Sequence, residues 1–474
     1  MSLWKVSLSS SVVLAGLTSG TLAADVPPQT TKAPASVATC ADPVVFVTTE
    51  CPLTYWGITV YGAIDMGVGW EQHGAPLNRD IITGVEELIQ KNSNRSLWLA
   101  TPNGLTQSYI GIKVKEEFAP DWFFVSDWSF GFDPYTLSAA NGPHSYLDNN
   151  GLPLALQSSN ADSSRAGQWY NGTAYAGVSN STFGTLTFGR QNSLTLDGVI
   201  EYDPMGAAYA FSVIGWSGLT AGAGDTEDAR VTTAVKYRNN IGSLRVAGFS
   251  QLGGYDFNNG AQAVYEGQLG YDFNFGSYGR LSLDSILTYD KGAVASSPLS
   301  PAATLLYPGT IGATISDDSS LMLLGKWVNG PFKISGGYEI IDFNNPLDPQ
   351  KLSFTDIAGI PVVASNINNA AYNNTRVQQV LWTGGRYAFT NALDAGVAYY
   401  HYYQDSYAKI ACRNNSFGAC AGALDAVSFD VDWQFAKKFD AYAGMLFSEV
   451  SNGLSSGYLH NENFAPTAGL RFRF

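Results

Sequence analysis

The chain has 474 residues, with 40 Asp or Glu against 26 Lys or Arg, a formal net charge of -14 at pH 7. This acidic balance argues against nucleic acid as a partner, because binding phosphates needs a basic surface. Charged residues make up only 14% of the chain, aromatic residues make up 13%, and there are 50 glycines. Disordered proteins have the opposite composition. The mean hydropathy of -0.04 is too low for a bundle of membrane-spanning helices. We therefore expect a β-rich fold that carries an apolar surface.

The first residues have the pattern of a secretory signal. Lys5 precedes an apolar run from Val6 to Leu17, and the small residues up to Ala24 suit a signal peptidase. The run is too short to span a bilayer, which needs about 20 apolar residues. We expect residues 1–24 to be a cleaved signal peptide and the mature chain to begin near Asp25.

Four cysteines fit an oxidising compartment. Cys40 and Cys51 lie before the first expected strand, and Cys412 and Cys420 lie in a late loop. Four cysteines allow three pairings, and sequence alone does not choose among them. Pairing of sequence neighbours is the simplest, because it closes two short loops. A zinc site would compete, but the chain lacks a C-x-x-C motif and its four histidines are scattered. We expect no metal and no cofactor.

From residue 57 onward the dominant pattern is alternation of apolar and polar residues. In residues 427–435, for example, every second residue is apolar and those between are polar. The segments that we expect to be strands are 57–70, 106–118, 121–132, 166–180, 183–190, 229–238, 242–252, 261–273, 278–290, 318–328, 331–343, 374–388, 392–404, 423–435, 440–450 and 465–474. Their number is even and most are near the ten residues of a tilted spanning strand, as in outer-membrane barrels.

The connections between these strands alternate in length. The long ones are 71–105, 133–165, 191–228, 291–317, 344–373, 405–422 and 451–464, and most of the others are turns of a few residues. Transmembrane barrels show this asymmetry, with short periplasmic turns and long extracellular loops, whereas a soluble β-sandwich has no reason for it. Residues 55–474 are therefore expected to form an all-β, 16-stranded antiparallel transmembrane barrel.

Several segments resemble one family. Residues 54–65 and 107–118 look like the first two strands of general bacterial porins, and 174–191 resembles the strands that lead into their constriction loop. The last strand places Leu470, Phe472 and Phe474 on one face, which resembles the C-terminal signature of barrel insertion. The resemblance covers residues 54–474. It implies a homotrimeric Gram-negative porin, with outer-membrane lipid and the barrel insertion machinery as partners, and no enzymatic activity.

The expected function is a water-filled outer-membrane channel for small hydrophilic solutes and ions. Residues 25–54, with Cys40 and Cys51, resemble the short N-terminal region of some alphaproteobacterial porins. Two placements are open for this extension: a plug of the periplasmic mouth, or a tail that trails from it.

By the same resemblance, residues 191–228 are the third loop, which folds inward and narrows the pore. It carries three acids, Asp197, Glu201 and Asp203, and then an apolar stretch, 209–216. The candidate basic residues of the opposite wall are Lys113, Lys115, Arg165, Arg190 and Lys236. Acids facing bases across a lumen set up a transverse field. We expect a weak cation preference set by the three acids.

Two alternatives stay open. A channel specific for a sugar or an anion would line its lumen with aromatic rings, and Tyr61, Tyr175, Tyr400 and Tyr402 are candidates. An outer-membrane barrel enzyme is the other. Residues 453–457 match G-x-S-x-G, but they lie between two expected strands, whereas a nucleophile elbow needs a strand, a turn and a helix.

Overall fold

The computed structural model describes residues 40, 43–73, 94, 96–102, 104–132, 134–135, 137, 147, 150–152, 172–216, 230–251, 263–347, 356–357, 360–456 and 458–474. The expected signal peptide, 1–24, and Arg165 lie outside these residues. Within the described ranges, no helix is both long enough and apolar enough to cross a membrane.

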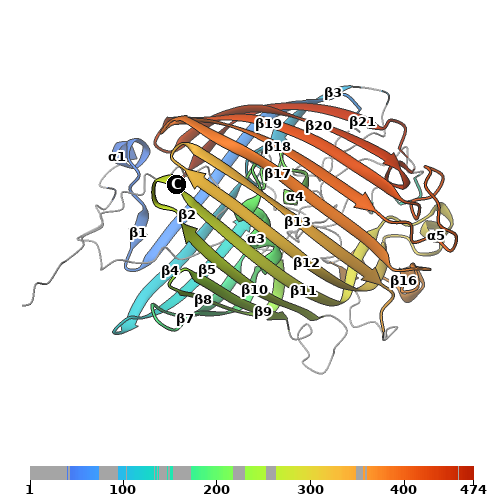
Figure 1. Cartoon of the computed structure of the whole chain (residues 1–474), viewed down its shortest axis with the longest axis horizontal. Coiled ribbons are helices and arrows are strands. Elements are labelled where there is room, and N and C mark those ends of the chain that lie inside the picture. Colours follow the sequence, from blue (N-terminus) through green and yellow to red (C-terminus); the bar gives the residue numbers. More distant parts are fainter. Residues whose placement is uncertain are drawn as a thin grey trace, which may run out of the picture.

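A closed 16-stranded antiparallel barrel forms the body of the molecule (Figure 1). Its strands are β2 (Ile58–Glu71), β4 (Tyr109–Ala119), β5 (Trp122–Gly131), β6 (Ala174–Asn180), β7 (Gly184–Asn192), β8 (Arg230–Ile241), β9 (Leu244–Gln251), β10 (Ala263–Asn274), β11 (Arg280–Ser297), β12 (Gly312–Asn329), β13 (Phe332–Asn344), β17 (Arg376–Thr390), β18 (Leu393–Gln404), β19 (Gly422–Ala436), β20 (Phe439–Asn452) and β21 (Glu462–Arg473). Each strand pairs with the next, and β21 pairs with β2, with Asp65 opposite Arg471. This last pairing closes the barrel and confirms the expected fold.

Five shorter elements decorate the barrel. β3 (Leu97–Pro102) pairs with residues 66–71 of β2, and residues 58–63 of β2 pair with β4. The others are β1 (Leu53–Tyr55), β14 (Asp356–Ile357), β15 (Ile360–Pro361) and β16 (Ile367–Asn368). Among the described residues, the α-helices are α1 (Pro43–Thr48), α3 (Leu194–Tyr202), α4 (Val213–Trp216) and α5 (Pro301–Leu306), and the single turns of 3₁₀ helix are Gly276–Tyr278, Ala364–Asn366 and Gly453–Ser455.

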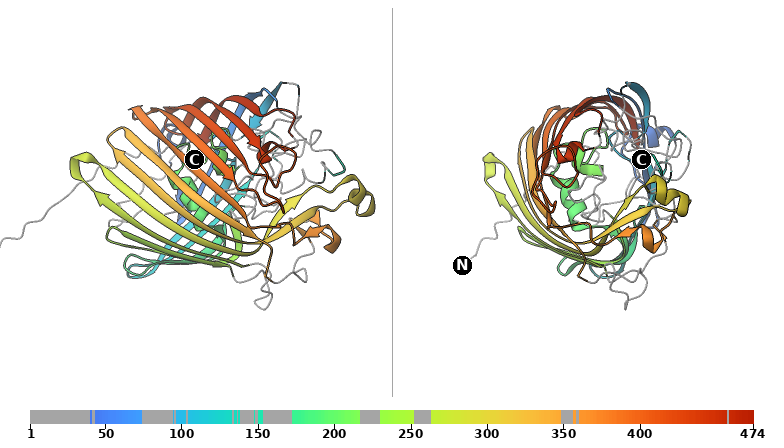
Figure 2. Two further views of the ribbon diagram at one scale, coloured as in Figure 1. Left: turned by 45° about the vertical axis from the view of Figure 1, so that its right-hand side comes forward. Right: turned by 90° about the vertical axis from the view of Figure 1, so that its right-hand side faces the viewer.

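Short turns gather at one rim of the barrel and long connections at the other (Figure 2). We call these the short-turn rim and the long-loop rim. Gly242 and Gly330 stand in two of the short turns with φ of 63° and 53°, a conformation that glycine adopts without strain. The end of the chain, Phe474, also lies at the short-turn rim, where its backbone pairs with Gly62.

Several expected loops contain strands. β3 lies within the expected loop 71–105, and β14, β15 and β16 lie within 344–373. Residues 291–317 were expected to be a long loop, but β11 continues to Ser297 and β12 begins at Gly312. A register shift between Asp290 and Ala293 interrupts the ladder, and pairing then resumes through Ala293 and Ser316. A bulge of this kind bends a strand without ending it. The alternation of the sequence is lost at such a point although the hairpin goes on.

The two faces of the wall differ as the alternation predicts. Outward side chains are apolar and exposed, for example Ile110, Ile112 and Trp128, whereas the inward Lys113 and Asp127 are polar. Outward aromatic rings contact one another near the short-turn rim; those of β19, β20, β21 and the C-terminal residue are Trp433, Phe435, Phe439, Phe472 and Phe474. We call these five rings the short-turn girdle. Membrane-spanning barrels carry such girdles at the level of the lipid headgroups.

Candidate functional site: the barrel lumen

A segment of chain that follows β7 lies inside the barrel (Figure 2). We call residues 193–212 the inner segment. Its helix α3 begins after Ser193, whose hydroxyl accepts a hydrogen bond from the backbone N–H of Leu196 at 3.0 Å. Of the nine helical residues only Glu201 is not buried. The apolar side chains of the inner segment pack with inward residues of the wall, including Ile286 and Trp382.

The first anchor of the inner segment is a buried ion pair. Asp197 pairs with Lys236 and Arg238 of β8, and its carboxylate accepts a hydrogen bond from Asn192 at 3.1 Å. Burial alone would raise the pKa of Asp197, but the two cations lower it below its ordinary value. Asp197 and Lys236 were expected to face each other across the water of the lumen, and this expectation is wrong. The two side chains form an ion pair between α3 and β8.

The middle of the inner segment is tied to the next strands. Thr195 donates its hydroxyl hydrogen to Glu266 of β10 at 3.0 Å. Tyr202 donates to Asp284 of β11, and Asp284 in turn pairs with Arg245 of β9 at 2.8 Å. The structure also pairs Glu201 with Lys326 of β12, yet 57% of the Glu201 side chain stays exposed. Glu201 is thus the expected pore acid that keeps access to water.

The far end of the inner segment contains a second buried acid. Asp203 accepts hydrogen bonds from the Tyr400 hydroxyl at 2.7 Å and from the backbone N–H of Ala207 at 2.7 Å. Burial raises the pKa of Asp203 above its ordinary value, although these hydrogen bonds oppose the rise. With an exposed fraction of 0%, Asp203 does not line the pore as expected. It holds a tight turn and fastens that turn to β18.

The tip of the inner segment reaches the opposite wall. The backbone N–H of Ala210 donates to the carbonyl of Gly104 at 2.8 Å, and the Phe211 ring meets the Tyr442 ring edge-on, with centroids 6.1 Å apart. Tyr442 donates to Asp65 at 2.6 Å. A Cβ added at Gly104 would lie 2.3 Å from the Tyr442 hydroxyl, so this close approach requires glycine. Sequence reasoning missed this contact, because Gly104 lies in an expected loop.

The remaining basic candidates separate into two groups. Lys113 lies 4.3 Å from the centroid of the Tyr61 ring and 3.8 Å from Asp127, with 36% of its side chain exposed. Lys115, two residues further on, is exposed and lies over the Phe123 ring. Arg190 instead donates to backbone carbonyls of Gly172 at 3.0 Å and Arg230 at 3.2 Å. β4 therefore presents cations to water, whereas Arg190 holds backbone in place.

Three further cations line the lumen beside the turn of the inner segment. Lys333, Arg386 and Arg471 border one small pocket together with residues 204–206. Arg386 pairs with Asp430 at 2.9 Å, and Arg471 pairs with Asp440 at 2.9 Å. None of these three cations was among the expected site residues. Alternation would have found Lys333, since it stands between Phe332 and Ile334, which are both outward and exposed.

Two of the four aromatic candidates do not line the lumen. Tyr400 and Tyr402 are buried in the cluster that receives the inner segment. Tyr61 is half-buried, and its hydroxyl donates to Asp127 at 2.7 Å. Two of the four expected rings thus serve packing, which removes them from the argument for a sugar-specific channel.

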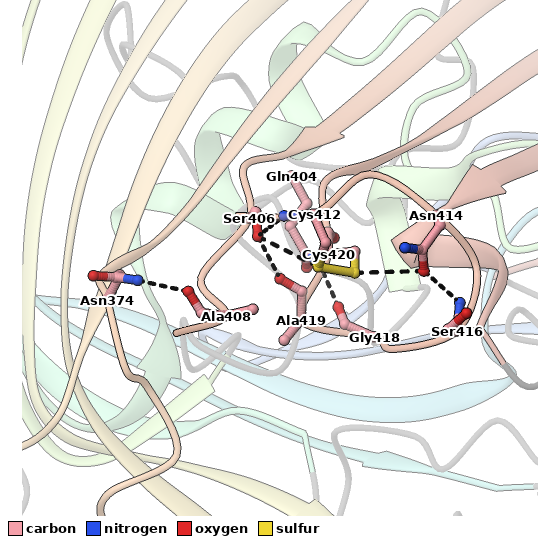
Figure 3. Close-up of a disulfide and its surroundings, with 10 residues drawn as sticks. All are labelled: Asn374, Gln404, Ser406, Ala408, Cys412, Asn414, Ser416, Gly418, Ala419 and Cys420. Carbon is pink, nitrogen blue, oxygen red and sulfur yellow. Dashed lines mark hydrogen bonds between the residues drawn. A yellow bond between two sulfur atoms is a disulfide. The ribbon is translucent and has the colours of Figure 1, made fainter. Parts of the chain in front are cut away.

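A disulfide closes the loop that joins β18 to β19 (Figure 3). Cys412 and Cys420 have Sγ atoms 2.03 Å apart, and the other two cysteines, Cys40 and Cys51, have theirs 2.05 Å apart. These are pairs of sequence neighbours, as expected. Gln404 donates to the carbonyl of Cys420 at 3.0 Å and so fastens the loop to the end of β18.

The structure offers little support for chemistry in the loops. Ser455 of the G-x-S-x-G match lies in one turn of 3₁₀ helix directly after β20, and its hydroxyl donates to the carbonyl of Asn452 at 2.8 Å. This is not a strand, turn and helix. In the part of the chain that the structure describes, no group of three or more His, Cys, Asp or Glu is placed to hold a metal ion.

Comparison with known proteins agrees with this architecture. The sequence model of the Gram-negative porin family matches residues 10–453. No curated protein matches the chain. An anion-selective porin from Comamonas acidovorans superposes with a TM-score of 0.55 at 13% identity, covering 88% of this chain and 99% of that one. Outer-membrane expressed OmpT of Vibrio cholerae gives 0.53 at 14% identity, covering 89% and 100%. At these identities the two structures share the fold.

Proposed function

This chain belongs to the Gram-negative porin family and is an outer-membrane channel for passive diffusion of solutes, and from this premise we propose that the inner segment narrows the channel. The solutes in this proposal are small and hydrophilic, and ions pass with them. Their passage involves no chemical step. The width of the lumen beside the inner segment and the charges there decide what passes.

One observation carries the proposal: the inner segment is fastened at both ends by buried contacts. Asp197 holds the first end to β8, and Asp203 and Phe211 hold the other end to β18 and β20. Breaking a buried ion pair by removing one partner costs about 3–5 kcal/mol. The inner segment is therefore a fixed part of the lumen wall and takes up cross-section permanently.

The ion preference in this proposal comes from charges that water reaches. Among the three acids of the inner segment, Glu201 is the one that water reaches, although Lys326 of β12 pairs with it, and Lys113 and Lys115 oppose it from β4. Asp197 shares its charge with two cations and Asp203 is buried, so both add little to the potential of a passing ion. We infer a mild cation preference in which Glu201 takes the largest part.

The mature protein and its assembly complete the proposal. Cleavage after Ala24 would leave a chain that begins at Asp25 and inserts through the Leu470, Phe472 and Phe474 signature. One solved OmpT of Vibrio cholerae, with a TM-score of 0.50, is described as the trimer form. We propose a homotrimer here as well. N-terminal sequencing of outer-membrane fractions and the mass of the unheated protein in detergent test both points.

Liposome swelling with neutral sugars of increasing size tests the channel itself. A diffusion channel gives rates that fall smoothly with sugar size and do not saturate with concentration. Planar-bilayer recordings of the same preparation should show conductance that rises with salt concentration. Uptake that saturates for one sugar and excludes others of equal size would favour the substrate-specific alternative.

A further inference from the structure

The N-terminal helix α1 lies at the short-turn rim, beyond the ends of the barrel strands (Figure 1). Its sequence, PVVFVT, is apolar apart from the final threonine. The Cys40–Cys51 disulfide closes the chain around it, and β1 then pairs with β2. We call residues 40–51 the disulfide loop. A helix this short does not form by itself in water, so contacts with the barrel must hold it.

The disulfide loop is attached to the turn between β19 and β20 and to the last strand. The Phe46 ring meets the Phe472 ring edge-on, with centroids 6.3 Å apart. Lys438 places its Nζ 3.8 Å from the centroid of Phe46 and donates to the carbonyl of Cys51 at 3.1 Å. Lys437 pairs with Glu50 at 3.2 Å. Every one of these partners belongs to the rim of the wall.

Phe472 shows which side of the wall the disulfide loop occupies. In the sheet, Phe472 stands opposite Ile64 of β2 on one side and Phe439 of β20 on the other. Its neighbour Arg471 points to the inside of the barrel, where it forms an ion pair with Asp440. Phe472 is therefore outward and belongs to the short-turn girdle. Phe46 adds a sixth ring to that girdle. For the described part of the extension, residues 40 and 43–54, this placement is neither a plug of the mouth nor a free tail.

The disulfide loop and the adjoining hairpin leave several apolar side chains exposed. Val44 is 70% exposed, and Val47 is exposed on the same short helix. In the hairpin of β1 and β2, Trp56 is 83% exposed and stacks on Tyr55 with centroids 5.0 Å apart. The contact between Phe46 and Phe472 joins the disulfide loop to the girdle, so these exposed apolar side chains lie at the same rim. Trp and Tyr are favoured where one end of a side chain is apolar and the other is wet.

We propose that the disulfide loop is an anchor at the membrane interface. Val44 and Val47 enter the boundary between headgroups and acyl chains in the leaflet that meets the short-turn rim. The partner is phospholipid. Apolar side chains gain by leaving water for that boundary, and the exposed Lys437 adds a positive charge that attracts anionic headgroups. This inference rests on the proposed function, because it needs the barrel to be in a membrane.

Site-specific photo-crosslinking to lipid tests the anchor in the full chain. The crosslinker p-benzoylphenylalanine replaces Val44 in protein reconstituted in phospholipid vesicles, and adducts are identified by mass spectrometry. Leu470, outward on β21 and 59% exposed, is the membrane control. Glu50, a charged and exposed residue of the same loop, is the aqueous control. We expect lipid adducts at positions 44 and 470, and a severalfold lower yield at position 50.

The outcomes separate this inference from the proposed function. Lipid adducts at position 470 without adducts at position 44 would overturn the anchor and leave the barrel in the membrane. A missing adduct at both positions would contradict the membrane placement itself. Adducts of position 44 with a second copy of the chain would overturn the anchor in favour of a subunit contact.

In the double variant C40S/C51S, the yield at position 44 should fall severalfold while the yield at position 470 holds. An unchanged yield at position 44 would overturn the part assigned to the disulfide.

Discussion

Two regions of the inner wall carry charge in different ways. Beneath the inner segment, β8 and β11 contribute Lys236 and Asp284, each buried and bound to a partner of opposite charge. On β4, Lys113 and Lys115 keep access to water. All four side chains point inward by the same alternation. Whether the inner segment covers a charge thus decides whether that charge is structural or acts on passing ions.

The two kinds of charge differ in energy as well as in access. Removing one partner of a buried pair leaves the other charge without compensation, at about 3–5 kcal/mol, whereas an exposed pair contributes about 0–1 kcal/mol. Substitutions under the inner segment should therefore change the shape of the channel. Substitutions on β4 should change its selectivity alone.

The largest effect is expected for Asp197→Asn. The change leaves Lys236 and Arg238 close together without the carboxylate that neutralises them. The first end of the inner segment should detach, at a cost of about 3–5 kcal/mol. Single-channel recordings should then show a larger and noisier conductance. Asp121→Asn, in the exposed turn between β4 and β5, is the matched control, and an unchanged conductance of the Asp197 variant would contradict the anchoring role.

Low pH should detach the first end of the inner segment in the parent protein as well. The cations hold the pKa of Asp197 below its ordinary value of 3.8. A carboxyl whose pKa is lower in the folded state than in the unfolded state stabilises the folded state at every pH above its unfolded-state pKa. This stabilisation is lost as the pH falls through the folded-state pKa. We expect constant conductance from about pH 8 to pH 5 and a rise below about pH 4. The Asp197→Asn variant has no carboxyl at this position, so its conductance should not rise further below about pH 4. A rise in the conductance of the parent protein that begins above pH 5 would contradict the assignment to Asp197.

A moderate effect should separate two lysines. Lys113→Gln removes an exposed cation, so the reversal potential should move toward cations while stability changes by no more than about 1 kcal/mol. Lys236→Gln removes a buried partner of Asp197, so it should raise the conductance as Asp197→Asn does. Bilayer recordings of both variants make the comparison. Equal shifts of reversal potential with equal conductance would show that the inner segment does not shield Lys236.

The smallest effect on transport is expected for C412S/C420S. The chain-entropy model gives a short disulfide loop about 2–3 kcal/mol of stabilisation. This loop is fastened to the end of β18 through Gln404 and belongs to the long-loop rim. Amide exchange of residues 405–421 should therefore accelerate, while conductance stays at the parent value. A changed conductance would place this loop in the pore.

Much of the barrel could be predicted from residue patterns, for a physical reason. Lipid on one side and water on the other impose a period of two on every spanning strand, and residues 427–435 show it without interruption. The pattern failed where one face changes its surroundings. Beyond Asp290, a register shift and cover from loops remove the contrast, so the outer parts of β11 and β12 were expected to be loop.

The lumen could be predicted only in part. The acids of the inner segment were recognised as a group, but which of them meets water depends on how α3 turns against the wall. Asp197, Glu201 and Asp203 lie within seven residues, and only Glu201 points away from the packed side. The partners come from strands far away in the chain, such as Tyr400. No local pattern carries that information.

The most direct test is the reversal potential in a salt gradient for two single variants, Glu201→Gln and Asp203→Asn. Both substitutions remove one acid from the inner segment, and they differ in whether water reaches it. We predict that Glu201→Gln moves the reversal potential toward anions and that Asp203→Asn leaves it at the parent value. Equal shifts for the two variants, or a shift for Asp203→Asn alone, would contradict the claim that exposed charges set the selectivity of this channel.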